Sequence, residues 1–267
     1  MPRAWTRVLP RTLGHVRENI EVPTYRDEAV VLRTHKLGEA DRIITMLSRH
    51  RGKLRAVAKG VRRTNSKFGA RLEPFSHVDL QFAVGRTLDV VTQVESMDAF
   101  GEPLTGNYPA YTAGQVMLET ADRLVVEENE PAVQQYLLLV GALRVLDRGT
   151  NDGPRPATMI LDSYLLRALA VAGYAPSFLD CARCGIAGPH RAFSPAAGGV
   201  VCEPCRPPGS SRPAPETLHL LGALLEGRWT DTRLVPRTVA QEASGITAAF
   251  VAWHLDRSLR SLAHVER

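Results

Sequence analysis

The sequence predicts an α+β multidomain protein in which a five-stranded OB-type β-barrel precedes an α-helical domain with an inserted four-cysteine zinc finger. Three observations predict this architecture. Five short runs between residues 28 and 95 alternate apolar and polar side chains, as the strands of a small barrel do. After Pro103 the apolar period lengthens from two residues to about 3.6, which is typical of amphipathic helices. All four cysteines form two C-x2-C pairs within a segment that has no helical period.

The composition is that of an ordinary globular protein. The chain has 267 residues, of which 44% are hydrophobic and 23% are charged, so wholesale disorder is excluded and roughly two domains are expected. No stretch approaches 18 consecutive apolar residues, which excludes a membrane-spanning helix. The N-terminal residues also lack the apolar core of a signal peptide. We therefore expect a cytoplasmic protein with no membrane partner.

Changes of pattern along the chain predict the domain boundaries. Residues 1–23 have neither a helical nor a strand period, and we expect them to form a mobile N-terminal arm. The barrel is expected at 24–101 and the helical domain at 102–267. Within the helical domain, the zinc-finger insertion is expected at about 176–212.

The barrel strands are predicted from short alternating runs, which cover residues 28–34, 41–48, 53–59, 77–84 and 87–95. The fourth run alternates most strictly and places these apolar side chains on one face: Val78, Leu80, Phe82 and Val84. His77 falls on the polar face, where we expect a surface side chain. Five strands fit an OB barrel, but an SH3-like barrel is also possible because the strand count does not determine the topology.

Five amphipathic helices are predicted after the barrel, over residues 109–128, 131–148, 154–173, 215–229 and 236–265. A proline stands near the start of each helix, where its missing N–H removes no helical hydrogen bond. The segment between the third and fourth helices is rich in Gly, Pro and Cys. It is therefore predicted to be an insertion in the helical domain.

The four cysteines, Cys181, Cys184, Cys202 and Cys205, predict a metal site. Seventeen residues separate the two C-x2-C pairs, and this spacing is typical of a tetrahedral zinc site. Four thiolates leave no open coordination position, so one structural Zn²⁺ per chain is expected. Two disulfides or free thiols are the alternatives, although a cytoplasmic location disfavours disulfides. His190 lies between the pairs and is interpreted as a surface residue.

The basic residues gather in the predicted barrel. Residues 1–96 carry a net charge of +8 and the remainder −3, which together give the overall +5. No acidic residue lies between Asp41 and Glu73, whereas nine basic residues lie within 49–71. Strand alternation places Lys53, Arg55 and Lys59 on one face. Such a surface suits a phosphate backbone, although a merely solvated charged face is the simpler alternative. The candidate DNA-binding residues are Arg33, Lys36, Arg42, Arg49, Arg51, Lys53, Arg55, Lys59, Arg62, Arg63, Lys67 and Arg71.

No catalytic motif is recognisable in the sequence. It contains no G-x4-G-K-[ST] loop, no G-x-S-x-G and no H-E-x-x-H. The acidic residues near the predicted strands are too few for a two-metal nuclease site. We therefore expect a protein that is not an enzyme.

Several segments, in order, resemble the RecO family of bacterial DNA repair and recombination-mediator proteins. They are Ala29-Val-Val-Leu-Arg33, Gly38-Glu-Ala-Asp-Arg-Ile-Ile-Thr45, Gly52-Lys-Leu-Arg-Ala-Val-Ala-Lys-Gly60-Val-Arg-Arg63, Leu72-Glu-Pro-Phe75, Gly85-Arg86-x-Leu88, Gly173-Tyr174, Cys181-x2-Cys184-Gly185, Phe193-Ser-Pro195, Gly198-Gly199 and Cys202-x2-Cys205. These segments run from about residue 26 to 205. The resemblance does not extend to residues 1–23.

The resemblance implies an OB barrel, a helical domain with an embedded zinc finger, and a non-enzymatic recombination mediator in DNA repair. Such a mediator binds single- and double-stranded DNA, anneals complementary strands and helps to load RecA onto strands coated by the single-stranded-DNA-binding protein (SSB). The implied partners are RecR, the acidic C-terminal tail of SSB and, indirectly, RecA, at a nucleoid-associated location in the cytoplasm. An RNA-binding OB-fold factor and a zinc-containing scaffold for protein interactions are the alternative functions.

Overall fold

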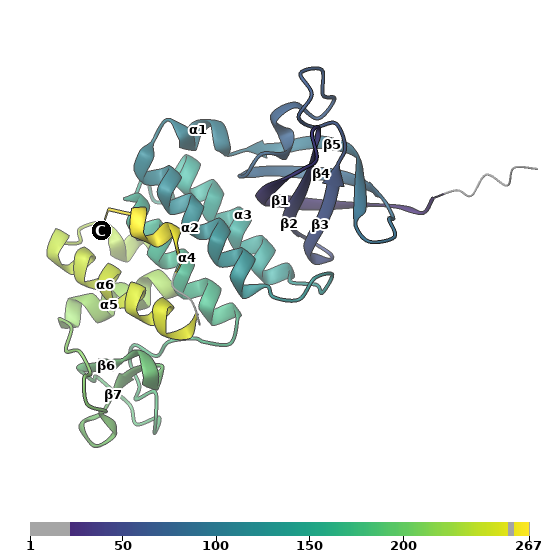
Figure 1. Cartoon of the computed structure of the whole chain (residues 1–267). Coiled ribbons are helices and arrows are strands. Elements are labelled where there is room, and N and C mark those ends of the chain that lie inside the picture. Colours follow the sequence, from purple (N-terminus) through teal and green to yellow (C-terminus); the bar gives the residue numbers. More distant parts are fainter. Residues whose placement is uncertain (1–21, 256–258, 267) are drawn as a thin grey trace, which may run out of the picture.

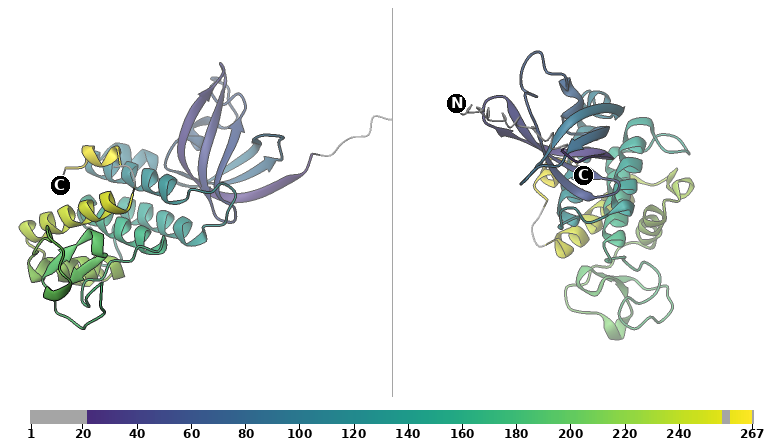
Figure 2. Two further views of the ribbon diagram at one scale, coloured as in Figure 1. Left: turned by 60° about the horizontal axis from the view of Figure 1, so that its bottom comes forward. Right: turned by 90° about the vertical axis from the view of Figure 1, so that its right-hand side faces the viewer.

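The computed structural model describes residues 22–255 and 259–266, and it consists of a β-barrel, a helical domain and a small ribbon at the far end of the helices (Figures 1 and 2). The predicted arm lies outside the described residues except for Val22 and Pro23. Among the described residues, no helix is both long and apolar enough to cross a membrane.

The barrel is closed and has the strand order β1-β2-β3-β5-β4. Its strands are β1 (Thr24–Leu37), β2 (Asp41–Ser48), β3 (Gly52–Ala58), β4 (Ser76–Ala83) and β5 (Asp89–Ala99). β3 and β5 pair in parallel, and the other neighbours pair antiparallel. This order is that of an OB-type barrel, so the topology decides against the SH3-like alternative that the strand count left open.

The β4 strand follows the predicted alternation with two exceptions. Val78, Leu80 and Phe82 are fully buried in the barrel core. Val84 is 46% exposed, contrary to prediction, because β4 ends at Ala83 and the turn begins there. The prediction for His77 was also wrong: its side chain is only 2% exposed, because the helical domain covers this end of the outer face of β4.

The helical domain is built around one almost completely buried helix, α4 (Ala157–Val171), which packs against α2 (Tyr108–Leu124), α3 (Val133–Arg148), α5 (Pro215–Glu226) and α6 (Arg237–His254). Its sequence is apolar on nearly every side, as expected for a helix with neighbours all around it. The short helix α1 (Gly101–Thr105) was not predicted. The last predicted helix is too long, because α6 ends at His254 and a separate 3-10 turn covers Ser261–His264.

The insertion between α4 and α5 forms a small ribbon. Its antiparallel strands β6 (Ala192–Ser194) and β7 (Gly199–Val201) are only three residues long, too short to show a strand period in the sequence. The 3-10 turn Glu203–Cys205 follows β7. The end of β7 and this turn carry Cys202 and Cys205, whereas Cys181 and Cys184 lie in the loop before β6, which is bonded to β7 through the Ala182 N–H and the Val200 carbonyl (2.8 Å).

The interior of the barrel forms a hydrophobic core of its own, whereas part of the barrel's outer face is buried in the core of the helical domain. Val30, Leu32 and Leu47 of the barrel belong to the same buried cluster as the apolar residues of α2 and α3. Gly52, at the start of β3, has a φ of +61°, and a Cβ atom there would lie 1.9 Å from the carbonyl oxygen of Glu130 in the α2–α3 connection. This close approach requires glycine. The two domains are therefore tightly packed against each other.

Candidate nucleic-acid interface and metal centre

Three of the predicted DNA-binding cations, Arg33, Lys53 and Arg55, lie where the barrel meets the helical domain. Lys53 is 13% exposed in its side chain, and its Nζ donates to the carbonyl oxygens of Asp122 (2.6 Å) and Val125 (3.0 Å) at the end of α2. The same ammonium forms an ion pair with the Asp122 carboxylate at 3.0 Å. Lys53 thus binds the carbonyls at the C-terminus of α2, where the helix dipole favours a cation.

The two neighbouring cations reinforce this junction. Arg33 Nε donates to Asp122 Oδ2 at 2.7 Å, and Arg55 Nε lies 2.6 Å from Glu128 Oε1. Burial alone would raise the pKa of Asp122, but hydrogen bonds from Arg33 and Lys53 outweigh it, and the pKa is lowered. Arg33 and Arg55 remain exposed. The three cations therefore hold the two domains together, a role that the sequence reasoning did not foresee.

A second group of cations projects from the end of the barrel formed by the β1–β2 turn and the exit of β3. We call it the loop-end cluster, and it consists of Lys36, Lys59, Arg62 and Arg63. Lys36 is paired in register with Arg42, and Arg42 with Ala58, so Lys36 and Lys59 lie near each other. All four side chains are exposed.

Arg62 fixes the shape of the loop-end cluster. Its N–H donates to the Ala40 carbonyl (2.9 Å), and its guanidinium donates to the carbonyls of Gly38 (3.2 Å) and Glu39 (2.8 Å). In contrast, Lys36, Lys59 and Arg63 form no side-chain hydrogen bond or ion pair within the described part of the chain. These three charges are therefore available to an anionic ligand.

The remaining predicted cations have partners within the barrel. Arg42 pairs with Glu73, and Arg49 with Glu28 at 3.0 Å. Arg51 lies over the Tyr25 ring, 3.9 Å from its centroid. In the β3–β4 loop, Lys67 donates to the Thr92 carbonyl (2.9 Å) and Arg71 to the Lys67 carbonyl (3.3 Å), yet both side chains remain exposed.

Arg86 is an exposed cation that was not selected from the sequence. It lies in the β4–β5 turn, just before Asp89, which pairs with Ala56 near the end of β3. The turn lies beside Pro23 and Thr24 at the start of β1 (Val84 N–H to the Pro23 carbonyl, 2.8 Å), whereas the loop-end cluster lies at the other end of this strand. Gly85-Arg86 lies between the two predicted strands 77–84 and 87–95, and a cation in such a turn was the signal that could have identified it.

A buried polar network also crosses the domain junction. His77 Nε2 lies 2.8 Å from the Tyr136 hydroxyl of α3, and its Nδ1 lies 3.1 Å from Asp98 Oδ2. Arg144 and Arg148 of α3 both bind the Asp98 carboxylate. Burial raises the pKa of Asp98, but the hydrogen bonds from Arg144, His77 and Arg148 prevail and lower it to about 2. His77 is thus a junction residue and not a surface side chain.

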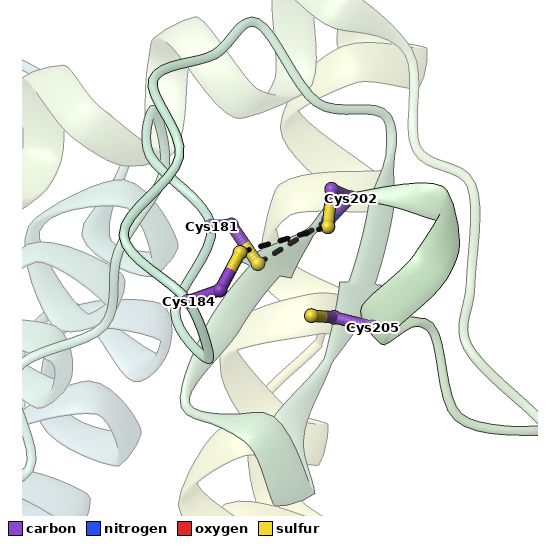
Figure 3. A group of neighbouring side chains, drawn as sticks. All are labelled: Cys181, Cys184, Cys202 and Cys205. Carbon is purple, nitrogen blue, oxygen red and sulfur yellow. Dashed lines mark hydrogen bonds between the residues drawn. The ribbon is translucent and has the colours of Figure 1, made fainter.

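The four cysteines converge on one point in the ribbon, as Figure 3 shows. All four sulfur atoms lie within 4.8 Å of one another, and the Sγ atoms of Cys184 and Cys202 are 3.8 Å apart. A tetrahedral site with Zn–S bonds of about 2.3 Å requires sulfur atoms about 3.8 Å apart. The arrangement can hold a metal ion, and its spacing is compatible with zinc.

Local hydrogen bonds shift the pKa values of two of these thiols in opposite directions. The backbone N–H of Cys202 donates to Cys181 Sγ at 3.4 Å and is the main cause that lowers the pKa of the Cys181 thiol to about 6. Hydrogen bonding with Cys202 raises the pKa of Cys205 to about 12. Because thiolates are the ligands, a bound ion would replace the protons that these sulfur atoms share.

The fold and these sites define a two-domain protein of the OB-barrel class, with a cationic barrel end and a thiol-rich ribbon in its helical domain. Family models described as the N terminal and C terminal regions of Recombination protein O match residues 22–100 and 106–263, respectively. The chain therefore belongs to the RecO family.

Several curated relatives match this chain over nearly their whole length. The chain is 61% identical over 246 residues to a protein of Cutibacterium acnes, a match that covers 92% of this chain and 100% of the relative. It is also 61% identical over 246 residues to a protein of Nocardioides sp., covering 91% and 99% of the two chains. A protein of Streptomyces coelicolor is 56% identical over 249 residues, with coverage of 91% and 99%. Each is named DNA repair protein RecO.

Proposed function

We propose that this chain is a non-enzymatic, DNA-binding recombination mediator in DNA repair. In this role it binds single- and double-stranded DNA, anneals complementary strands and, together with RecR, helps to load RecA onto SSB-coated single strands. The observation that supports it best is the loop-end cluster, in which Lys36, Lys59 and Arg63 are exposed without an internal partner among the described residues. Membership of the RecO family supports the repair context, which implies a nucleoid-associated, cytoplasmic location.

Charge neutralisation is the proposed mechanism of annealing. Two DNA strands repel each other through their phosphates, and bound cations reduce this repulsion while releasing condensed counterions. The loop-end cluster offers these cations at the end of β1 and at the start of the β3–β4 loop, which Arg62 ties to the β1–β2 turn. Arg33 and Arg55 are exposed as well, but to bind DNA they would have to exchange their carboxylate partners for phosphate groups.

Zinc is the proposed ion of the ribbon. Cys181, Cys184, Cys202 and Cys205 would hold it, and the spacing of the sulfur atoms supports this assignment. Four thiolate ligands leave no coordination position for water, so the ion would stabilise the ribbon without taking part in any reaction. Its removal would unfold the ribbon and leave the barrel intact.

The groove between the ribbon and α5 is the proposed site for the C-terminal tail of SSB. It has a volume of about 640 Å³, and Phe178, Leu218 and Leu225 contribute to its apolar lining. The basic side chain of Arg191 suits an acidic peptide, whereas Arg228 on the same rim is paired with Glu226 and Asp231, and Asp180 also lies there. The apolar lining beside the basic side chain of Arg191 supports the proposal.

Annealing of complementary oligonucleotides by a Lys59→Glu/Arg63→Glu variant tests the proposal. Neither side chain bonds to the rest of the described structure, so the variant is expected to fold normally and to lose annealing. Arg206→Glu/Arg237→Glu is the control, because it makes the same change in net charge on exposed residues far from the barrel. Unimpaired annealing by the first variant, or equal loss in both variants, would contradict the mechanism. Stronger competition by RNA than by DNA would favour an RNA-binding factor.

A further inference from the structure

A groove opens where the β3–β4 loop meets the start of the helical domain. Its volume is about 600 Å³, and it is lined by the loop, the end of β5, α1 and the first turns of α2. In Figure 1, α1 connects β5 to α2 along the top of the view. We call this site the junction groove, and the residues used below are Lys67, Arg71, Phe75, Glu102 and Tyr111.

One wall of the junction groove is aromatic and rigid. The half-buried ring of Tyr111 lies against Phe75, with ring centroids 5.6 Å apart. Phe75 has a φ of +73°, an unfavourable conformation for an aromatic residue. It is held there by a hydrogen bond from its N–H to the Val31 carbonyl (3.1 Å) and by the close approach of its ring to Gly114, where a Cβ atom would lie 2.7 Å away. Strained backbone of this kind is found preferentially at functional sites.

Exposed cations of the β3–β4 loop lie between the loop-end cluster and the aromatic wall of the junction groove. β3 ends at Ala58, near the start of β5, whereas β4 begins at Ser76, opposite the last residue of β5. The β3–β4 loop therefore runs along the whole length of β5. Its exposed cations Lys67 and Arg71 lie at the lip of the groove. The cationic surface and the junction groove are thus continuous.

The groove also offers one carboxylate without a cationic partner. Asp98 is neutralised by Arg144 and Arg148, and Glu73 by Arg42. Glu102, in the first turn of α1, is exposed and forms no ion pair with the described part of the chain. A carboxylate can accept a hydrogen bond from an exocyclic amino group of a base.

We propose that the junction groove binds one unpaired nucleobase of single-stranded DNA. The base stacks on Tyr111, the flanking phosphates contact Lys67 and Arg71, and Glu102 accepts a hydrogen bond from the amino group of the base. Aromatic stacking is the usual way in which proteins hold unpaired bases. Thymine has no exocyclic amino group, and its N3–H donor is flanked by two carbonyl oxygens that repel a carboxylate, so the groove favours cytosine over thymine. This inference rests on the proposed DNA-binding function and adds a base-binding site to it.

Photo-crosslinking with a single-stranded oligodeoxycytidine that carries one iododeoxycytidine tests the proposal. The cross-link is expected on Tyr111, mapped by mass spectrometry of the full chain. Tyr111→Leu should abolish it and weaken binding about tenfold, an effect within the range measured for stacking of one base. Tyr108→Leu is the matched control, since Tyr108 is 59% exposed on the same helix and lies outside the groove. It should cross-link and bind like the wild type.

Two further variants distinguish loss of base stacking from misfolding, and failure of the base site from failure of the proposed function. Tyr111→Phe keeps the aromatic ring and should retain DNA binding. If only Tyr111→Leu loses binding, the loss is due to missing base stacking and not to misfolding. Glu102→Ala should remove the preference for oligodeoxycytidine over oligothymidylate. Wild-type binding by Tyr111→Leu, or a cross-link outside the groove, would overturn the base site while leaving the proposed function intact. If the wild-type chain binds no oligonucleotide, the proposed function and the base site fail together.

Discussion

Replacing Asp122 by Asn tests whether Lys53 joins the domains. The substitution removes the carboxylate that faces both Lys53 and Arg33, and Lys53 is then left with only carbonyl partners at 13% exposure. Removing one partner of a fully buried ion pair costs about 3–5 kcal/mol, whereas an exposed pair contributes about 0–1 kcal/mol. Because this pair is largely but not fully buried and keeps its carbonyls, we expect a loss of about 2 kcal/mol.

The assay is thermal unfolding followed by circular dichroism at neutral pH. A loss of this size corresponds to a decrease in Tm of roughly 4–8 °C for a chain of this length. Asp79→Asn is the control, since Asp79 faces Arg26, whose side chain is 57% exposed; its effect should stay below about 1 kcal/mol. In the double variant with Lys53→Met, part of the stability lost in Asp122→Asn should return, because the only charge that loses its partner is then the exposed Arg33. Equal effects of Asp122→Asn and Asp79→Asn would refute the reasoning.

The pKa of Asp122 adds a pH dependence to this prediction. The folded-state pKa of Asp122 lies below the ordinary aspartate value of 3.8. The stabilisation is therefore complete above about pH 4, and it is lost as the pH falls through the folded-state value. In Asp122→Asn the dependence of stability on pH below about 4 should be correspondingly weaker.

Three further predictions follow from the same structure. Gly52→Ala should destabilise the chain by at least about 2 kcal/mol, because the new Cβ would meet the Glu130 carbonyl and φ is positive; a Tm within one degree of the wild type would contradict the close packing. Cys184→Ser should reduce the zinc content, measured by atomic absorption, from one ion per chain to well below one, whereas undiminished zinc would exclude this thiol as a ligand. In Asp98→Asn the free energy of unfolding should fall less steeply between about pH 4 and 2, since the pKa of Asp98 is lowered from 3.8 to about 2. The same pH dependence as in the wild type would show that Arg144 and Arg148 do not stabilise the folded carboxylate.

The fold could be predicted largely from local patterns. Burial alternates along β3 as the sequence suggests, with Leu54, Ala56 and Ala58 inside, because the period of a strand is a local property. The proximity of the two cysteines within each C-x2-C pair was predictable for the same reason, whereas the convergence of the two pairs was predicted from the spacing typical of a zinc site. The strands β6 and β7 were not, because three residues carry no detectable period.

The roles of individual cations depend on contacts between residues that are far apart in the sequence, and these roles could not be predicted from local patterns. Lys53 meets Asp122, 69 positions away, and His77 meets Tyr136, 59 positions away. Nothing in the run between residues 49 and 71 distinguishes Lys53, which binds α2, from Lys59, which projects from the barrel. The sequence located the basic surface, and the packing of the helical domain determined which of its charges remain available.

The salt dependence of single-stranded DNA binding tests the central claim most directly. Each phosphate contact on a single strand contributes about 0.7 to the slope of log Kd against log salt concentration. Replacing Lys36, Lys59 and Arg63 by Gln should therefore reduce the slope by roughly 2, measured by fluorescence anisotropy of a labelled oligonucleotide. Lys53→Gln should leave the slope unchanged. A wild-type slope in the triple variant, or a decrease in slope only in Lys53→Gln, would contradict the assignment of the loop-end cluster as the DNA-binding surface.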